Sequence, residues 1–210
     1  EGNIGTGKTT FLDFLDKLYK NDTVVYEPVD QWLSTKDSDN KNILDKFYSD
    51  QERWSFTFQM NSFISRIKAV DDAPEKRIKF VERSVFTDKI CFAKNCFENG
   101  KMSKIEYDIY CNWHTWLCKK FDITPKYFIY LKTNPEISEE RIKKRSRTEE
   151  SGIPLEYLKQ LHNNHEEWMK DNVSKGINVL YLDVSTNFYE NDEERAKIIE
   201  QVEIPIENID

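Results

Sequence analysis

Long hydrophobic runs are missing from this sequence of 210 residues. No apolar stretch approaches the roughly 18 residues that a membrane-spanning helix needs, and the first residues do not have the pattern of a signal peptide. We therefore expect no membrane partner and a cytoplasmic location. A targeting segment ahead of residue 1 would indicate a mitochondrial location instead.

Cysteine is rare as well, and the four cysteines do not follow the spacing of a disulfide framework. We expect Cys91, Cys96, Cys111 and Cys118 to be reduced thiols. Cys111, His114 and Cys118 could share one helical face and bind a metal, but the pattern offers no convincing fourth ligand. Packing in the core or at an interface is the simpler interpretation.

An excess of basic residues is also lacking, because 31 Lys and Arg stand against 38 Asp and Glu, which gives a net charge of -7. Nucleic acids and anionic membranes need a basic surface, so we expect neither as a partner. With 38% hydrophobic residues and no repeat or low-complexity tract, the chain can bury one sizeable core. Residues 1–210 are expected to form a single domain.

Glycine is scarce overall, yet three of the six glycines lie among the first seven residues. The run Gly2-Asn3-Ile4-Gly5-Thr6-Gly7-Lys8-Thr9 fits the pattern G-x-x-x-x-G-K-[ST], whose backbone N–H groups surround nucleotide phosphates. In this pattern Lys8 neutralises the terminal phosphates and the Thr9 hydroxyl can ligate Mg²⁺. The sequence therefore predicts a site for a nucleoside triphosphate, followed by a helix over about residues 9–20.

Four short β-rich runs recur along the chain, at residues 23–27, 78–82, 127–132 and 178–183. Long stretches with helical periodicity separate them, notably residues 50–70 and 104–120. This alternation predicts an α/β fold in which a parallel sheet is flanked by helices. A phosphate loop normally follows a strand, so we expect five strands, the first of which is absent from the given chain.

Polar residues stand where two of these strands end, which is where ligands gather in parallel sheets. Glu27 is the candidate base, because Pro28 fixes it at the tip of its strand and Trp32 offers an aromatic wall nearby. In the second group, Glu82 could reach a Mg²⁺ ion and Arg83 could stabilise the transferred charge. Either group alone could also be a surface carboxylate or a salt bridge at a strand end.

Arginines form a third group of candidates at Arg141, Arg145 and Arg147. A run of cations is usually a solvated helix face, but Gly152 and Pro154 end this helix soon afterwards. The pattern is typical of an arginine-rich lid, at about residues 141–152, that covers a triphosphate when it closes.

These motifs together resemble the deoxynucleoside kinase family, over nearly the whole chain. The resemblance rests on the phosphate loop, on Glu27-Pro28-Val29 with Trp32, on Glu82-Arg83-Ser84, and on the segment from Arg141 to Glu150. It implies the P-loop kinase fold and transfer of the γ-phosphate of ATP, with Mg²⁺, to the 5′-hydroxyl of a deoxynucleoside.

The resemblance also assigns roles to individual residues. The catalytic residues would be Glu27, Arg83 and Lys8, and Mg²⁺ would lie near Thr9 and Glu82. ATP binding is implied for Gly2, Asn3, Ile4, Gly5, Thr6, Gly7, Lys8, Thr9, Thr10, Arg141, Arg145, Arg147 and Phe188. Binding of the acceptor is implied for Glu27, Trp32, Tyr48, Phe58, Gln59, Ser62, Arg66, Arg83, Asp88, Phe92 and Glu150, with Tyr48 and Glu150 on the sugar 3′-hydroxyl.

The residues of the acceptor pocket bear on the choice of base. Asp88 can accept a hydrogen bond from an exocyclic amino group, Arg66 can donate to N7 or O6 of a purine, and Gln59 can do both. Thymine offers Asp88 a carbonyl and Arg66 a methyl group, so thymidine should be a poor substrate. The sequence around these pocket residues looks most similar to the deoxyguanosine branch of the family. This similarity favours a purine deoxynucleoside as the substrate, and deoxycytidine remains an alternative.

Two other functions fit the phosphate loop. A nucleoside monophosphate kinase also combines this loop with a lid, but it needs cations for the acceptor phosphate, which Glu27 would repel. A nucleotide-dependent switch would hydrolyse slowly and need no acceptor. The resemblance further implies a homodimer, for which the aromatic residues and cysteines of residues 84–99 and 104–120 would suit a buried interface.

Overall fold

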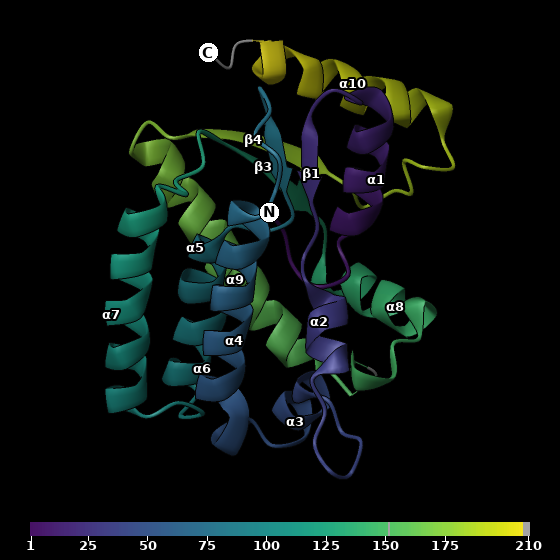
Figure 1. Ribbon diagram of the computed structural model, residues 1–210. Coiled ribbons are helices and arrows are strands. Elements are labelled where there is room, and N and C mark those ends of the chain that lie inside the picture. The colour runs from purple at the N-terminus through teal and green to yellow at the C-terminus, as the bar shows by residue number, and fades with distance from the viewer. Residues whose placement is uncertain (151, 208–210) are drawn as a thin grey trace.

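The computed structural model describes residues 1–150 and 152–207, which alternate between strands and helices (Figure 1). The strands are β1 (Thr23–Val25), β2 (Lys79–Val81), β3 (Tyr127–Lys132) and β4 (Asn178–Asp183). The helices are α1 (Lys8–Leu18), α2 (Val29–Ser34), α3 (Ile43–Ser49), α4 (Gln51–Asp71), α5 (Val85–Thr87), α6 (Lys94–Glu98), α7 (Lys104–Phe121), α8 (Pro135–Arg145), α9 (Leu155–Ser174) and α10 (Asp192–Glu207). A π-helical turn, η1 (Asp88–Ala93), joins α5 to α6, and a 3-10 turn, η2 (Thr148–Glu150), follows α8.

Local sequence signals explain where several of these helices begin and end. The side chain of Asp50 caps α4, and Ser103 with Glu106 forms a capping box at the start of α7. Helix α8 begins at Pro135 and ends where Ser146 adopts a left-handed conformation with φ 55°. The predicted helices over residues 50–70 and 104–120 therefore correspond closely to α4 and α7.

All four predicted strands are present, but they form two parallel pairs and not one sheet. β1 pairs with β2, and β3 pairs with β4. Between the pairs lies Glu1, whose backbone nitrogen donates to the Ile129 carbonyl at 2.7 Å and whose carbonyl accepts from the Leu131 N–H at 2.9 Å. The five-stranded sheet is thus not confirmed: in the described part of the chain, a groove of about 530 Å³ separates β2 from β3.

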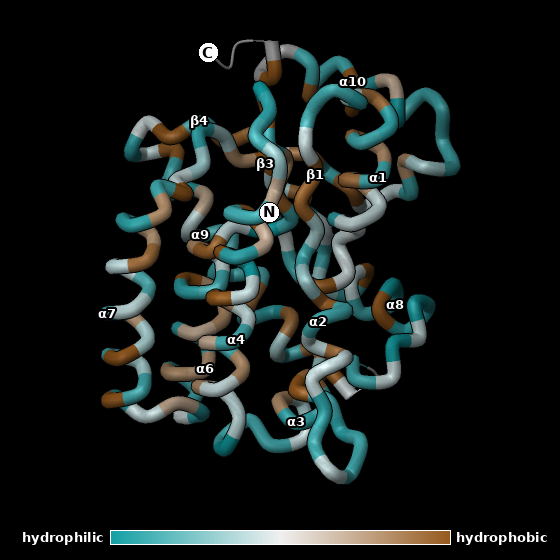
Figure 2. The backbone as a smooth tube through the Cα atoms, in the orientation of Figure 1, coloured by the Kyte–Doolittle hydropathy of each residue, from teal (hydrophilic) through white to brown (hydrophobic). Residues whose placement is uncertain are grey.

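The main core lies between the strands and the two helices α1 and α10. Phe11 and Leu15 of α1, Phe80 of β2, Leu182 of β4 and Val202 of α10 are all buried in one cluster. Figure 2 shows the same pattern, with hydrophobic stretches in the strands and in α1. This packing fixes α1 against the sheet and so fixes the phosphate loop from which α1 starts.

A second layer consists of α4, α7 and the segment that contains η1 and α6. Cys91, Ala93 and Cys96 of that segment are buried within the chain itself. Residues 84–99 thus contribute buried side chains to the core of the chain itself, and their part in the expected dimer interface remains a prediction.

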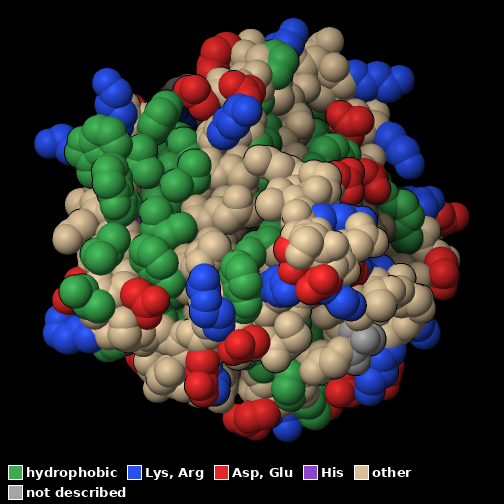
Figure 3. Space-filling view, turned by 60° about the horizontal axis from the view of Figure 1, so that its bottom comes forward, with side chains coloured by type: hydrophobic (Ala, Val, Ile, Leu, Met, Phe, Trp, Pro, Cys, Tyr) green, Lys and Arg blue, Asp and Glu red, His purple; other side chains and the backbone are tan. Residues whose placement is uncertain are grey.

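Helix α7, in contrast, leaves large apolar side chains exposed on the outer edge of the molecule. Ile105 is 70% exposed, Trp113 is 49% exposed and Trp116 is 55% exposed. A patch of hydrophobic side chains covers this side of the molecule in Figure 3. Among the described residues, no helix has both the length and the apolar character needed to cross a membrane.

The four cysteines are free thiols in the structure. His114 contacts the Cys118 sulfur at 3.6 Å, donates a hydrogen bond from Nε2 to the Val85 carbonyl at 3.0 Å, and stacks on Phe63 with ring centroids 5.0 Å apart. Within residues 1–150 and 152–207, no group of three or more His, Cys, Asp or Glu side chains is arranged to hold a metal ion. His114 and Cys118 thus take part in core packing.

Candidate active site

The phosphate loop is a tight turn held against β3 and α8. A Cβ atom at Gly5 would lie 2.5 Å from the Ser138 carbonyl oxygen, and Gly5 has a φ of 79°. Both the contact and the dihedral angle require glycine here. Gly7, with a φ of 90°, leads directly into α1, so the N-terminal end of that helix faces the space enclosed by the loop.

Lys8 lies inside this loop and is 8% exposed. Its Nζ donates to the Asn3 carbonyl at 2.6 Å, and Thr6 Oγ1 donates to the same oxygen at 3.1 Å. Burial, together with the nearby charge of Arg83, lowers the pKa of Lys8 to about 7. A triphosphate would replace the Asn3 carbonyl as the partner of the ammonium group and would favour its charged form.

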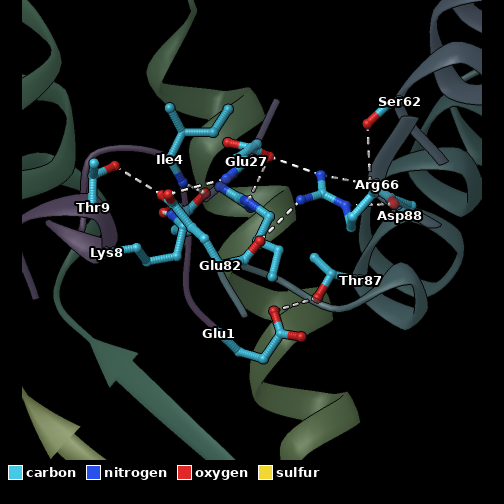
Figure 4. Close-up of polar contacts among 12 residues, drawn as sticks. Glu1, Ile4, Lys8, Thr9, Glu27, Ser62, Arg66, Glu82, Thr87 and Asp88 are labelled. Atoms are coloured by element: carbon cyan, nitrogen blue, oxygen red, sulfur yellow. Dashed lines mark hydrogen bonds and ion pairs between the residues drawn. The ribbon is translucent and has the colours of Figure 1, made fainter. Parts of the chain in front are cut away.

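Thr9 and Glu82 come together at the edge of the loop, as the sequence predicts. The Thr9 hydroxyl donates to Glu82 Oε1 at 2.8 Å, and Glu82 is 6% exposed (Figure 4). A hydroxyl and a carboxylate are hard oxygen donors of the type that Mg²⁺ uses together with phosphate oxygens and water. The residues therefore fit a Mg²⁺ ion that a nucleotide would bring with it.

Glu27 lies at the centre of a cluster of cations. Its Oε1 accepts from Arg66 Nη2 at 2.8 Å and lies 3.5 Å from Arg83 Nε. Burial would raise the pKa of Glu27, but Arg83, Arg66 and Lys8 together lower it to about 2. The carboxylate is therefore ionised and faces the phosphate loop across the space seen in Figure 4.

Arg66 joins Glu27 to Asp88, with the contact to Asp88 buried and the contact to Glu27 partly buried. Arg66 donates from Nε to Asp88 Oδ2 at 2.8 Å, from Nη2 to Asp88 Oδ1 at 3.2 Å, and from Nη1 to the Glu82 carbonyl at 3.0 Å. Asp88 also accepts from the Ser62 hydroxyl at 3.3 Å. Burial would lower the pKa of Arg66, but Asp88 and Glu27 raise it, so the guanidinium stays charged.

Arg83 is strained and has unpaired donors. It is a non-glycine residue with a φ of 59°, a conformation that costs about 1–3 kcal/mol. Its guanidinium carbon lies 4.8 Å from the centre of the Phe92 ring, and the residue is 4% exposed. Within the described part of the chain, Nε and Nη1 have no hydrogen-bond partner. A buried guanidinium in this state is suited to an incoming anion.

One cavity of about 1090 Å³ connects these groups. All the residues that the sequence assigned to the site line it, except Gly2 and Asn3. Asn3 is buried behind the loop, where its Nδ2 donates to the Leu158 carbonyl at 2.8 Å. The structure thus brings together three segments that are far apart in the sequence: the phosphate loop, the strand ends and the predicted lid.

The acceptor end of the cavity is aromatic and contains one amide that faces the open space. Phe58 stacks on Phe47 with centroids 4.6 Å apart and meets Trp32 edge-on at 5.4 Å. Gln59 lines the same space, and its Nε2 makes a long contact of 4.0 Å with the Cys96 sulfur. A base that enters here would find the Gln59 amide available for pairing.

The predicted lid runs from α8 into η2 and carries its arginines in two different states. Arg145 and Arg147 both form ion pairs with Glu150. Arg141 instead donates to the Val184 carbonyl at 2.7 Å and to the Thr6 carbonyl at 3.4 Å. Arg141 therefore links the phosphate loop to the segment that follows β4. Residue 151 of the predicted lid lies outside the described residues.

Phe188, which the sequence assigned to the donor base, is 5% exposed. It packs edge-on against Phe11 and Phe14, with centroids 6.1 and 6.2 Å away. Phe188 lines the cavity together with its neighbours Thr186 and Asn187.

Sequence reasoning missed several residues of the cavity wall. Leu44 and Phe47 of α3 and Ile137 and Glu140 of α8 line it as well. Ile137 lies four residues before Arg141 on α8, so helical periodicity could have indicated it. Phe47 gave no such signal, because its pattern is equally typical of ordinary core packing.

Comparison with known proteins agrees with this geometry. Residues 1–207 match the deoxynucleoside kinase family. The chain is 38% identical to human deoxycytidine kinase over 94% of this chain and 88% of that protein, and 36% identical to deoxycytidine kinase 1 of Xenopus laevis over 96% and 87%. It is also 35% identical to human mitochondrial thymidine kinase 2, over 80% of this chain and 62% of that enzyme.

Proposed function

The chain belongs to the deoxynucleoside kinase family and is an ATP-dependent kinase of deoxynucleosides, and we propose that its acceptors are deoxycytidine and purine deoxynucleosides, with thymidine disfavoured. The observation that carries this proposal is the buried Arg66–Asp88 pair in the same cavity as Gln59, whose amide makes only a long contact with the Cys96 sulfur among the described residues. The relatives named above include both deoxycytidine kinases and a thymidine kinase, so the base preference depends on the pocket and not on the family.

The charges of the pocket support this preference. Asp88 offers oxygen acceptors to the exocyclic amino group of cytosine or adenine. Arg66 makes four donor contacts, two to Asp88, one to Glu27 and one to the Glu82 carbonyl. A guanidinium has five N–H bonds, so one remains to donate to a base. Thymine would place a carbonyl against Asp88 and leave buried polar groups unpaired, at about 1–3 kcal/mol each. The preference for purine deoxynucleosides that was inferred from the sequence remains a prediction.

In the proposed reaction, Glu27 orients the 5′-hydroxyl and accepts its proton as the oxygen attacks the γ-phosphate. Arg83 and Lys8 face the charge that spreads over the transferred group. Thr9 and Glu82 would hold Mg²⁺, which supplies charge neutralisation at the phosphates. Tyr48 and Glu150 would bind the 3′-hydroxyl, with Glu150 released from Arg145 and Arg147 as these arginines turn to the phosphates.

We further propose that the complete sheet has five parallel strands. The groove between β2 and β3 exposes the edges of both strands, and the backbone of Glu1 already pairs with β3. An extended segment that enters Glu1 along this groove would join the two pairs into one sheet.

A homodimer through α7 is the proposed assembly. The exposed Ile105, Ile109, Trp113 and Trp116 would be covered by the same face of a second copy. Cytoplasmic location remains a prediction.

The proposal is tested by measuring ATP-dependent phosphorylation of the four deoxynucleosides side by side, with deoxynucleoside monophosphates as control acceptors. We expect turnover of deoxycytidine and of purine deoxynucleosides, with thymidine at least ~10-fold less efficient in kcat/KM. Efficient thymidine turnover would contradict the base preference and leave the kinase assignment intact.

A further inference from the structure

The carboxylate of Glu1 reaches across the sheet edge to the segment that carries Arg83. Its Oε1 accepts from the Ser84 N–H at 2.8 Å, and its Oε2 accepts from the Thr87 hydroxyl. The contact between Glu1 and Thr87 is visible in Figure 4. These bonds satisfy two polar groups at the beginning of α5, where Ser84 makes no capping bond of its own.

The two residues beside Arg83 are both held from outside their own segment. Glu82 is fixed on one side, because its N–H donates to the Val25 carbonyl at 2.8 Å and its carbonyl accepts from Arg66 at 3.0 Å. Ser84 is fixed on the other side by Glu1. A left-handed conformation at an arginine persists only where the surroundings impose it, and these two clamps impose it here.

Glu1 also belongs to the start of the phosphate loop. It directly precedes Gly2, and its backbone is tied to Ile129 and Leu131 of β3. The same residue therefore fixes the beginning of the loop that surrounds Lys8 and the turn that aims Arg83. A shift of either element would be transmitted to the other through the half-buried side chain of Glu1.

We propose that Glu1 is a positioning residue that couples the phosphate loop to Arg83 and keeps the Arg83 guanidinium aimed at the transferred phosphoryl group. This inference rests on the role given to Arg83 under the proposed function. Glu1 does not line the cavity that holds the candidate site, so loss of its side chain should act through the segment that carries Arg83.

The experiment compares Glu1→Ala with Glu1→Gln in steady-state kinetics with ATP and the preferred deoxynucleoside. Glu1→Ala should lower kcat by ~10-fold or more, with the KM of both substrates changed less than about twofold. Glu1→Gln keeps an oxygen for the Ser84 N–H and should recover most of kcat. Thr87→Val removes the other bond and conserves the shape of the side chain, so it should lower kcat in the same manner. This variant replaces Glu1→Ala in the test when Glu1→Ala does not fold.

A double-mutant cycle with Arg83→Ala separates positioning from general loss of structure. In the Arg83→Ala background, Glu1→Ala should cost less than about twofold, because the group that it positions is already gone. Equal losses in both backgrounds, or a normal kcat in Glu1→Ala, would overturn the inference. Glu166→Gln is the matched control, since the Glu166 carboxylate contacts Lys132 of β3 at 2.7 Å and should leave kcat unchanged. Normal turnover in Arg83→Ala alone would instead contradict the proposed function.

Discussion

The two halves of the cavity hold their charges in opposite ways. On the acceptor side, the side chains of Arg66 and Asp88 are 2% and 3% exposed and are bonded to each other through two pairs of atoms. On the donor side, Arg145 and Arg147 are 40% and 27% exposed, and both contact a single carboxylate, Glu150. The acceptor side is thus fixed before any ligand arrives, while the donor side depends on contacts that can be exchanged.

The difference follows from the cost of burying charge. A buried ion pair tolerates little movement, since separating it leaves a charge without a partner in a medium of low polarity. Arg145 and Arg147 are partly exposed, so water can replace Glu150 as their partner and these pairs can open at a lower cost. Under the proposed function, selection of the acceptor belongs to the rigid half, and closure over the donor belongs to the half that can rearrange.

Among the substitutions in the rigid half, Glu27→Gln should lower the activity most. The substitution removes the group that orients the hydroxyl and takes its proton, so we expect kcat to fall by at least ~10²-fold with little change in deoxynucleoside affinity. Steady-state kinetics and equilibrium binding measure the two quantities. Glu136→Gln, which changes an exposed carboxylate paired with Lys159, is the control. Near-normal turnover would remove Glu27 from the mechanism.

The selectivity of the rigid half should change in the double variant Arg66→Met with Asp88→Ala. Removing both charged partners together avoids an uncompensated buried charge and removes the groups that oppose thymine. We expect the ratio of thymidine to purine kcat/KM to rise by ~10-fold or more. The single variant Asp88→Ala, which leaves Arg66 without its main partner, should be less stable to heat. An unchanged ratio would place base recognition elsewhere in the cavity.

Substitutions on the donor side should mainly change the KM for ATP. Arg145→Ala removes a cation that can turn from Glu150 to the phosphates, so we expect the KM for ATP to rise by about fivefold to tenfold. The KM for the deoxynucleoside serves as the internal comparison and should change less. Lys143→Ala removes a cation of the same helix that is paired with Glu139, and it should have no effect. Equal effects of the two substitutions would argue against a lid.

The phosphate loop links the two halves and should make ATP binding depend on pH. Because the pKa of Lys8 is lowered to about 7, the ammonium loses its proton as the pH rises through this value in the free protein. A bound triphosphate favours the charged form, so binding takes up a proton, and the affinity should be about threefold to fivefold weaker at pH 8 than at pH 7. Calorimetry in buffers of different ionisation enthalpy measures the proton uptake. Lys8→Arg should show a flat profile, and a flat profile in the wild type would contradict the prediction.

Short-range patterns were sufficient to predict the strands, the phosphate loop and the main helices. Two strands end earlier than expected, at Val25 and Val81, so Glu27 and Glu82 lie beyond them. In the described residues the strands form two separate pairs and not the expected five-stranded sheet, and several apolar side chains of residues 84–99 pack into the core of the chain itself. In both cases the sequence pattern identifies an apolar or extended segment but does not identify what lies against it.

The sequence by itself determined the phosphate-loop motif and the nucleotide-binding chemistry expected of it, because the glycine spacing, Lys8 and Thr9 lie within one short stretch of chain. Only the tertiary structure decided that Arg66 reaches Glu27 over 39 residues and that Glu1 reaches Ser84 over 83. Such contacts depend on how separate segments pack, and no local periodicity encodes them. The strain at Arg83 and the low pKa of Glu27 arise from the same long-range packing.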